Sequence, residues 1–269
     1  MESWELHSMA RRYLMARYTE LSERYAELPD QGRDGYSVEA QRTYPRYNVV
    51  AAMLTEVERL DPDDLPPVQP LAAALMHAAE TARSVFTDPP TGPIEAEAMS
   101  AERQRFARAV TAWVADADVT VEPLGYRRVL RPEEASGWRS RLASRWDVEL
   151  SDVSSLSWHP LSAGPVPDEV LVLREDSTWD GPGVTLVRQA LHHLGRRRVV
   201  ELREHGPEYL LDVDLLEPHY TGAEGLWTDE TLDWLAYASH EGTLAFGGTL
   251  AAELRGSWPR LEEWRWSGW

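Results

Sequence analysis

The chain has 269 residues, with 45 acidic residues against 27 basic ones, and its formal net charge is -18. It contains no cysteine and no lysine. These two absences exclude thiol nucleophiles, zinc fingers and iron–sulfur clusters, and also lysine Schiff bases and phosphate-binding lysines. Any catalytic group must therefore be Ser, Thr, Tyr, His, Asp, Glu or Arg.

The negative charge is spread along the whole chain. Residues 1–120 carry a net charge of -8 and residues 121–269 a net charge of -10. Neither half offers a basic patch, which argues against direct binding to nucleic acid or to an anionic membrane surface. A partner protein with a basic surface is electrostatically favoured.

Two further features of the composition concern source and location. The single Ile, the single Asn and the absence of Lys indicate a GC-rich genome, because the codons for these residues are AT-rich, and a bacterial source is the simplest reading. The first residues lack a signal-peptide pattern, and no run reaches the ~20 apolar residues of a membrane span. We therefore expect a cytoplasmic protein.

The first 118 residues predict an all-α domain of about four helices separated by prolines. Apolar residues recur every three or four positions, so each helix has one apolar face, as in a helix bundle or an extended helical arm. Pro45 is expected in the first turn of the second helix. The apolar stripes cover residues 14–28, 50–60, 71–85 and 99–113.

Residues 119–269 differ in composition and apolar pattern and contain ten of the 12 tryptophans. A helix is expected from Pro132, a buried strand over 170–173, a helix over 184–194 and a short helix from Thr249. Two β-hairpins are predicted, the first across His205-Gly206-Pro207 and the second across His240-Glu241-Gly242. Since hairpins outnumber crossover units, we predict an α+β fold with a mostly antiparallel sheet.

The segment from Asp233 to Thr243 is the first candidate for a catalytic site. Asp233 and His240 are candidate general bases or ligands of a hydrolase. Ser239 and His240 are neighbours on a strand, where their side chains point apart, so they are a poor nucleophile–base pair. The alternative is a hairpin whose turn is polar only because turns lie in solvent.

The second candidate is a divalent-metal site formed by Asp212, Asp214 and His219. The two aspartates are spaced to share one face of a strand, and carboxylates with a nearby imidazole suit a hard divalent ion or acid–base chemistry. The same alternation directs Tyr209 and Leu211 to the core, which would leave both aspartates in solvent.

A basic segment, Arg196-Arg197-Arg198, follows the helix that ends in His192-His193. Adjacent histidines on a helix point ~100° apart and do not readily share one metal ion. Histidines and arginines near a helix C-terminus interact favourably with its dipole, which is the simplest role for them. The arginines are also suited to binding a carboxylate or phosphate, although this acidic chain offers many internal partners.

Five aromatic residues are candidate partner-binding groups because tryptophan is enriched at interaction hot spots. They are Trp158 and His159 in the Ser-rich stretch 151–167, and Trp264, Trp266 and Trp269 in the tail. We expect the tail to pack on its own domain, with self-association as the alternative.

The sequence contains no Gly-x-Gly-x-x-Gly, Gly-x-x-x-x-Gly-Lys, His-Glu-x-x-His or Gly-x-Ser-x-Gly motif. We expect a non-catalytic protein-binding protein without a cofactor, of an accessory, regulatory or immunity type, which would mask a basic surface on its partner. The alternatives are a hydrolase or metal-assisted enzyme with its site in the second domain, and a structural subunit of a larger assembly or homo-oligomer.

Overall fold

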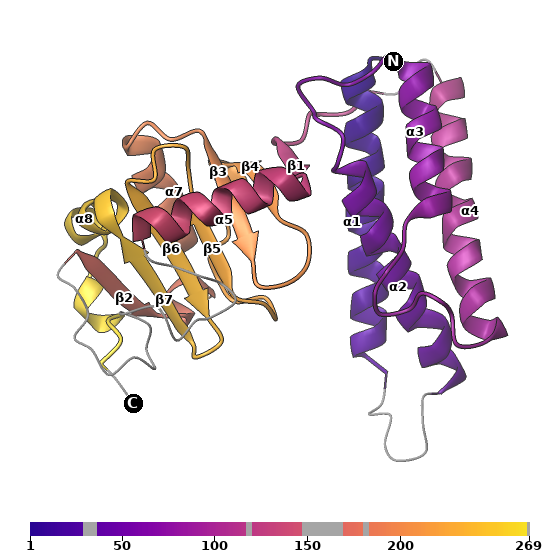
Figure 1. The fold of residues 1–269 in the computed structure, drawn as a ribbon. Coiled ribbons are helices and arrows are strands. Elements are labelled where there is room, and N and C mark those ends of the chain that lie inside the picture. Colours follow the sequence, from indigo (N-terminus) through magenta and orange to yellow (C-terminus); the bar gives the residue numbers. More distant parts are fainter. Residues whose placement is uncertain (29–36, 117–119, 147–168, 180–182, 268–269) are drawn as a thin grey trace. The chain divides into compact units, whose positions relative to one another are not determined.

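The structure is a computed structural model that describes all residues except 29–36, 117–119, 147–168, 180–182 and 268–269. The chain divides into two compact units, Met1–Leu124 and Gly125–Trp269. The first is helical and the second contains an antiparallel sheet of seven strands (Figure 1). The predicted α+β class is therefore confirmed. Among the described helices, none combines the length and apolar character needed to cross a membrane.

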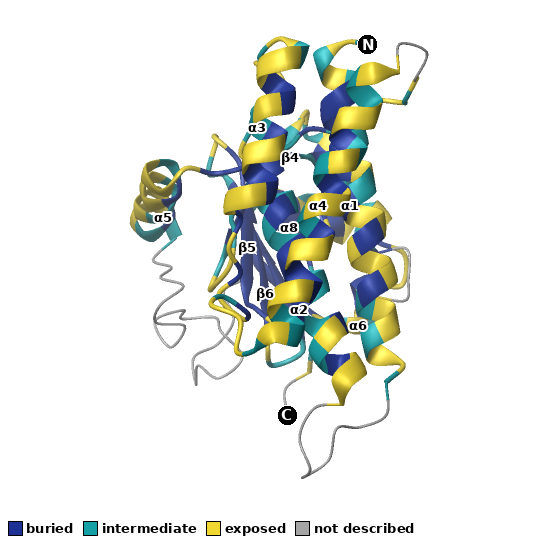
Figure 2. Ribbon diagram, turned by 90° about the vertical axis from the view of Figure 1, so that its right-hand side faces the viewer, coloured by how far each residue is buried: buried dark blue, intermediate teal, exposed yellow. Residues whose placement is uncertain are grey.

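The helical unit is a bundle whose core is formed by the predicted apolar stripes. Leu14, Val50, Leu75 and Phe106 are almost fully buried and belong to one cluster. Figure 2 shows the buried residues as a stripe along each helix, with exposed residues on the opposite side. The helices are α1 (Ser3–Ala26), α2 (Val38–Val57), α3 (Val68–Thr81) and α4 (Pro93–Ala115).

Pro45 does not occupy the first turn of α2, so this prediction is wrong. The helix begins at Val38, where the side chain of Ser37 accepts a hydrogen bond from the Ala40 amide at 3.1 Å. This cap satisfies an amide at the start of the helix. Pro45 is buried inside the helix. The capping residue, and not the proline, sets where the helix starts.

A buried ionic cluster joins three helices of the bundle. Glu102 of α4 is 2% exposed, and its carboxylate is 2.7 Å from Nη2 of Arg17 in α1 and 2.5 Å from Nη2 of Arg46 in α2. Burial by itself would raise the pKa of Glu102, but the hydrogen bonds from Arg17 and Arg46 lower it. The carboxylate is therefore charged, and the three helices are fixed in register by its partners.

The Glu102→Gln variant should lower the free energy of unfolding by about 3 kcal/mol, because Arg17 and Arg46 lose a buried counter-charge. Denaturant unfolding followed by circular dichroism at the helix band measures this change. Glu97→Gln, at an exposed position of the same helix, is the matched control and should have little effect. Equal stability of the two variants would contradict the role given to the cluster.

His7 is a buried histidine on α1, only 2% exposed. Its Nε2 lies 3.2 Å from the carbonyl oxygen of Val57 and donates a hydrogen bond to it. Burial, reinforced by the charge of nearby Arg11, lowers the pKa of His7 from the ordinary 6.5 to about 4. His7 is therefore neutral in the folded protein at neutral pH.

The lowered pKa of His7 predicts a loss of stability in acid. The unfolded chain takes up this proton near pH 6.5 and the folded protein only near pH 4. The free energy of unfolding should therefore fall as the pH falls through this window, by about 3 kcal/mol in total. His7→Gln keeps a donor for the Val57 carbonyl, and it should remove this part of the pH dependence of the free energy of unfolding, measured by denaturant unfolding at several pH values. His77→Gln, on the exposed side of α3, is the control and should leave this pH dependence unchanged.

The second unit is built on one sheet with the strand order β1-β4-β3-β5-β6-β7-β2, in which all neighbours are antiparallel. The strands are β1 (Arg127–Val129), β2 (Val170–Arg174), β3 (Arg198–Arg203), β4 (Tyr209–Asp212), β5 (Gly225–Thr228), β6 (Trp234–Ser239) and β7 (Thr243–Gly247). The helices are α5 (Pro132–Trp146), α6 (Asp176–Trp179), α7 (Gly183–His193) and α8 (Gly248–Ser257).

Both predicted hairpins are present, as β3–β4 and β6–β7. The sequence does not predict β5, which pairs with β3 on one side and β6 on the other and so joins the two hairpins. All four residues of β5 are buried. A strand this short and buried on both faces shows no alternation of apolar and polar residues.

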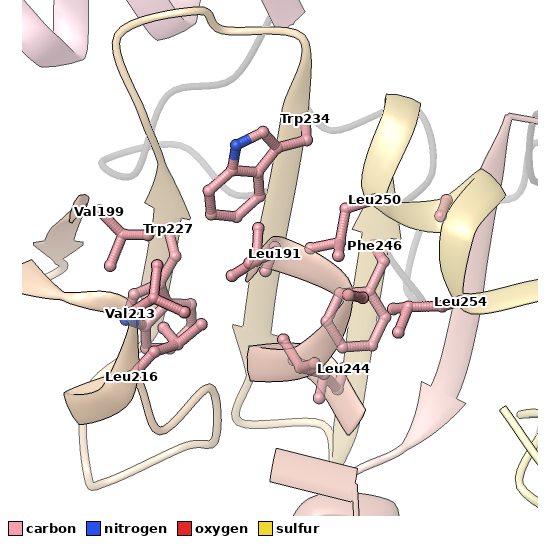
Figure 3. Close-up of a cluster of buried hydrophobic side chains, with 14 of the residues drawn as sticks. Leu191, Val199, Val213, Leu216, Trp227, Trp234, Leu244, Phe246, Leu250 and Leu254 are labelled. Carbon is pink, nitrogen blue, oxygen red and sulfur yellow. The ribbon is translucent and has the colours of Figure 1, made fainter. Parts of the chain in front are cut away.

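Helices cover both faces of the sheet. On one face, Trp234 lies near Leu191 of α7, and Phe246 lies near Leu250 and Leu254 of α8 (Figure 3). On the other face, Leu235 belongs to the same cluster as Leu142 of α5. Every residue of β6 is therefore buried, and no charged side chain lies within the strand.

Candidate functional site

A pocket of about 810 Å³ opens at one end of the sheet. Its rim is formed by the α7–β3 turn, the residues around the end of β4 and the β5–β6 turn. Trp138 of α5, Val200 of β3 and Leu210 of β4 supply its apolar lining. A ligand pocket of this size is within the range found in small-molecule binding proteins.

Arg196 and Asp233 form an ion pair beside this pocket. Nη2 of Arg196 is 2.7 Å from Oδ2 of Asp233, and Nε is 3.3 Å from a carboxylate oxygen of Asp229. Asp229 is buried and also accepts a hydrogen bond from the amide of Thr231 at 2.9 Å. The carboxylate of Asp233 thus fixes the β5–β6 turn to the start of β3.

Arg198 and Asp212 are also held by neighbouring groups. The guanidinium of Arg198 lies 3.5 Å above the ring of Tyr126, and its Nε is 3.6 Å from Oδ1 of Asp212. The other carboxylate oxygen of Asp212 accepts a hydrogen bond from the Tyr126 amide at 2.7 Å. Asp212 therefore fixes the segment before β1 to the end of β4.

The three predicted metal ligands, Asp212, Asp214 and His219, have separate partners. Asp214 contacts His192 at 2.8 Å, and the ring of His219 lies against Trp179 with centroids 4.6 Å apart. β4 ends at Asp212, and a 3-10 turn over Val213–Leu215 follows. The prediction that Asp212 and Asp214 share a strand face is wrong because the strand ends between them. No group of three potential metal ligands occurs among the described residues.

His240 lies in the turn between β6 and β7, between two carboxylates. Its Nδ1 is 2.5 Å from Glu224 and its Nε2 is 2.9 Å from Glu241. Glu224 is fully buried and also accepts a hydrogen bond from the Tyr237 hydroxyl at 2.6 Å. The hydrogen bond to Glu224 is the main cause that raises the pKa of His240. Both ring nitrogens thus donate, and the imidazole is cationic in this arrangement.

The structure does not bring Asp233 and His240 together. They flank the six residues of β6, which separates them by roughly 20 Å at the rise of an extended strand. The residues that do surround His240 are Glu224, Tyr237 and Glu241. Sequence reasoning misses Glu224 because it lies 16 positions away, before a strand with no sequence signal.

The raised pKa of His240 should be measurable by NMR titration of its imidazole. We expect a midpoint above 6.5 in the wild type and a lower midpoint in Glu224→Gln, because the main hydrogen-bonding carboxylate is lost. Glu262→Gln, an exposed carboxylate elsewhere in the unit, is the control and should not move the midpoint. The stabilisation from the charged imidazole is present below pH 6.5 and is lost as the pH rises through the folded pKa.

The tail packs on its own unit, as expected. The amide of Arg174 in β2 donates to the Trp264 carbonyl at 2.9 Å, and the Trp266 amide donates to the Val172 carbonyl at 3.2 Å. The indoles of Trp264 and Trp266 are half-buried against the two clusters on opposite faces of the sheet. The tail therefore covers the edge of β2. Trp158, His159 and Trp269 lie outside the described residues.

Among the described residues, the most exposed large apolar side chains are in the helical unit, in the connection between α3 and α4. Val85 is 90% exposed and Phe86 is 70% exposed. The predicted continuation of the third helix to Val85 is wrong, because α3 ends at Thr81. Arg103 of α4 donates to the carbonyls of Ala79 and Ala82 and so satisfies the end of the helix.

The connection is held by hydrogen bonds of its own. The carbonyl of Ser84 accepts hydrogen bonds from the amides of Thr87 and Asp88 at 3.3 and 3.0 Å. The carboxylate of Asp88 is 2.8 Å from Nε of Arg83. We call residues 83–88 the apolar turn. It presents Val85 and Phe86 to solvent on a backbone with fixed hydrogen bonds.

No protein-family model matches this chain, and no curated protein and no solved structure is detectably similar to it. The function must therefore be argued from the chemistry of these sites.

Proposed function

We propose that this protein works by binding another protein, as an accessory, regulatory or immunity-type partner, and that the helical unit makes the contact. The observation that carries the proposal is the apolar turn, where two large apolar side chains are 90% and 70% exposed. Contiguous apolar surface on a folded domain marks protein–protein contacts, because exposing it to water costs free energy that a partner recovers.

The distribution of exposed apolar residues supports the helical unit as the binding surface. Eight large apolar side chains are exposed among the described residues, and seven of them lie in this unit, two in the apolar turn. Trp179 is the one in the second unit. The others are Trp4, Met15, Tyr18, Val38 and Met76.

The geometry of the apolar turn favours binding by insertion into a partner. The hydrogen bonds to Ser84 and the ion pair of Arg83 with Asp88 restrict the backbone before any partner binds. Less conformational entropy is then lost on binding. Phenylalanine is enriched in the buried centres of interfaces. A partner with an apolar pocket for Phe86 complements this turn.

The charge of the chain supports a basic partner. The net charge is -18, and exposed Glu80 and Glu97 lie on the two helices that flank the apolar turn. Basic residues around the partner's apolar pocket would steer association and make it dependent on salt. By binding there, the protein would mask a basic surface on its partner.

The double variant Val85→Ser with Phe86→Ser should lose its partner. With the wild type immobilised in a lysate of its own source, we expect one protein to be retained in stoichiometric amount. The double variant should bind that protein about 30-fold more weakly, as expected for the loss of one interface hot spot. Titration of the purified partner against each variant measures the difference.

Trp4→Ser is the matched control, since it also replaces an exposed aromatic residue but lies in the first turn of α1, at the other end of the bundle from the apolar turn (Figure 1). It should retain the partner. Capture of no protein in stoichiometric amount, or equal capture by the double variant and the wild type, would overturn the proposal.

A further inference from the structure

We infer that the pocket at the end of the sheet binds a free α-amino acid with a large aromatic side chain. This inference concerns the second unit and is independent of the proposed function. It depends on which charges around the pocket are already neutralised, on which are not, and on the apolar part of the pocket lining.

Most of the charged groups around the pocket are held by partners. Arg196 is paired with Asp229 and Asp233, Arg198 with Asp212, and Asp214 with His192. These contacts fix the rim, because each joins two segments that are distant in sequence. The same contacts neutralise the charges of those side chains. A ligand therefore gains less from binding them than from binding a charged side chain without a counter-ion.

Two charged side chains around the pocket remain. Arg197 and Glu230 are exposed, line the pocket and have no ion-pair or side-chain hydrogen-bond partner in the part of the chain that the structure describes. They are opposite in sign. A ligand that carries one positive and one negative group can therefore neutralise both, whereas a ligand with a single charge leaves one unsatisfied.

The topology places Arg197 and Glu230 on neighbouring connections at the same end of the sheet. Arg197 directly precedes β3 and Glu230 follows β5, and these strands are paired with Val200 opposite Thr228. Two charges on adjacent connections suit a ligand whose own charges are close together. The ammonium and carboxylate of an α-amino acid are attached to one carbon atom and meet this condition.

The apolar lining of the pocket selects the side chain of the ligand. Val200 and Leu210 are apolar, and Trp138 contributes an indole ring. An aromatic side chain gains from burial against such a surface and from contact with the indole, over which the guanidinium of Arg141 lies at 4.2 Å. A volume of about 810 Å³ leaves room for a ring system as large as an indole.

The test uses L-phenylalanine with two derivatives that each lack one charge, N-acetyl-L-phenylalanine and L-phenylalaninamide. Calorimetric titration of the wild type should show the zwitterion binding about tenfold more tightly than either derivative, the loss expected for one charge-assisted hydrogen bond. L-Alanine, which has both charges but no aromatic ring, should bind more weakly still. In NMR spectra, L-phenylalanine should shift the indole N–H signal of Trp138, assigned with Trp138→Phe.

Two variants separate the contributions of the charges. Arg197→Gln should bind L-phenylalanine as weakly as the wild type binds the amide, and Glu230→Gln as weakly as the wild type binds the acetyl derivative. Both residues are exposed, so the variants should fold normally. Arg260→Gln, an exposed arginine outside the pocket, is the control and should bind like the wild type.

The inference is overturned if L-phenylalanine does not bind to the wild type up to its solubility limit, or if the three ligands bind equally. It is also overturned if Arg197→Gln and Glu230→Gln bind all three as the wild type does. Loss of partner capture by the apolar-turn variant has no bearing on these outcomes, because the two sites are on different units.

Discussion

The second unit depends on one constraint, the burial of its central strands on both faces. Every side chain of β5 and β6 is buried, because α7 and α8 cover one face of the sheet and α5 covers the other. Charged groups are costly in such a core unless they are paired. Ionic chemistry around these strands is therefore concentrated at their ends, where the chain turns.

The two ends of the sheet use these charged groups differently. At one end, His240 is held between Glu224 and Glu241, and Tyr237 completes the shell of buried Glu224. At the other end, several ion pairs fix the rim of a pocket but leave Arg197 and Glu230 without partners among the described residues. The first arrangement stabilises a turn, and the second offers unneutralised charge to a ligand.

The helical unit has an apolar core, but a few charged and apolar groups depart from the usual arrangement. A carboxylate, Glu102, lies in its interior between two arginines, while Val85 and Phe86 lie in solvent. The buried charges contribute specificity of helix pairing, since a carboxylate that needs two counter-ions fits only one arrangement of α1, α2 and α4. The exposed apolar residues are the observation on which the proposed contact with a partner rests.

The sequence by itself determines the α+β class, the helical and sheet-containing parts and both hairpins, because each depends on local periodicity or turn residues. It favours packing of the tail on its own unit but leaves self-association open, since that choice depends on contacts with β2. The tertiary structure alone decides the rest. Glu224 meets His240 and Arg17 meets Glu102 only after strands and helices distant in sequence have paired. Asp212 and Asp214 are separated by a turn that no alternation pattern reveals. The end of α3 is satisfied by Arg103, which reaches it from another helix.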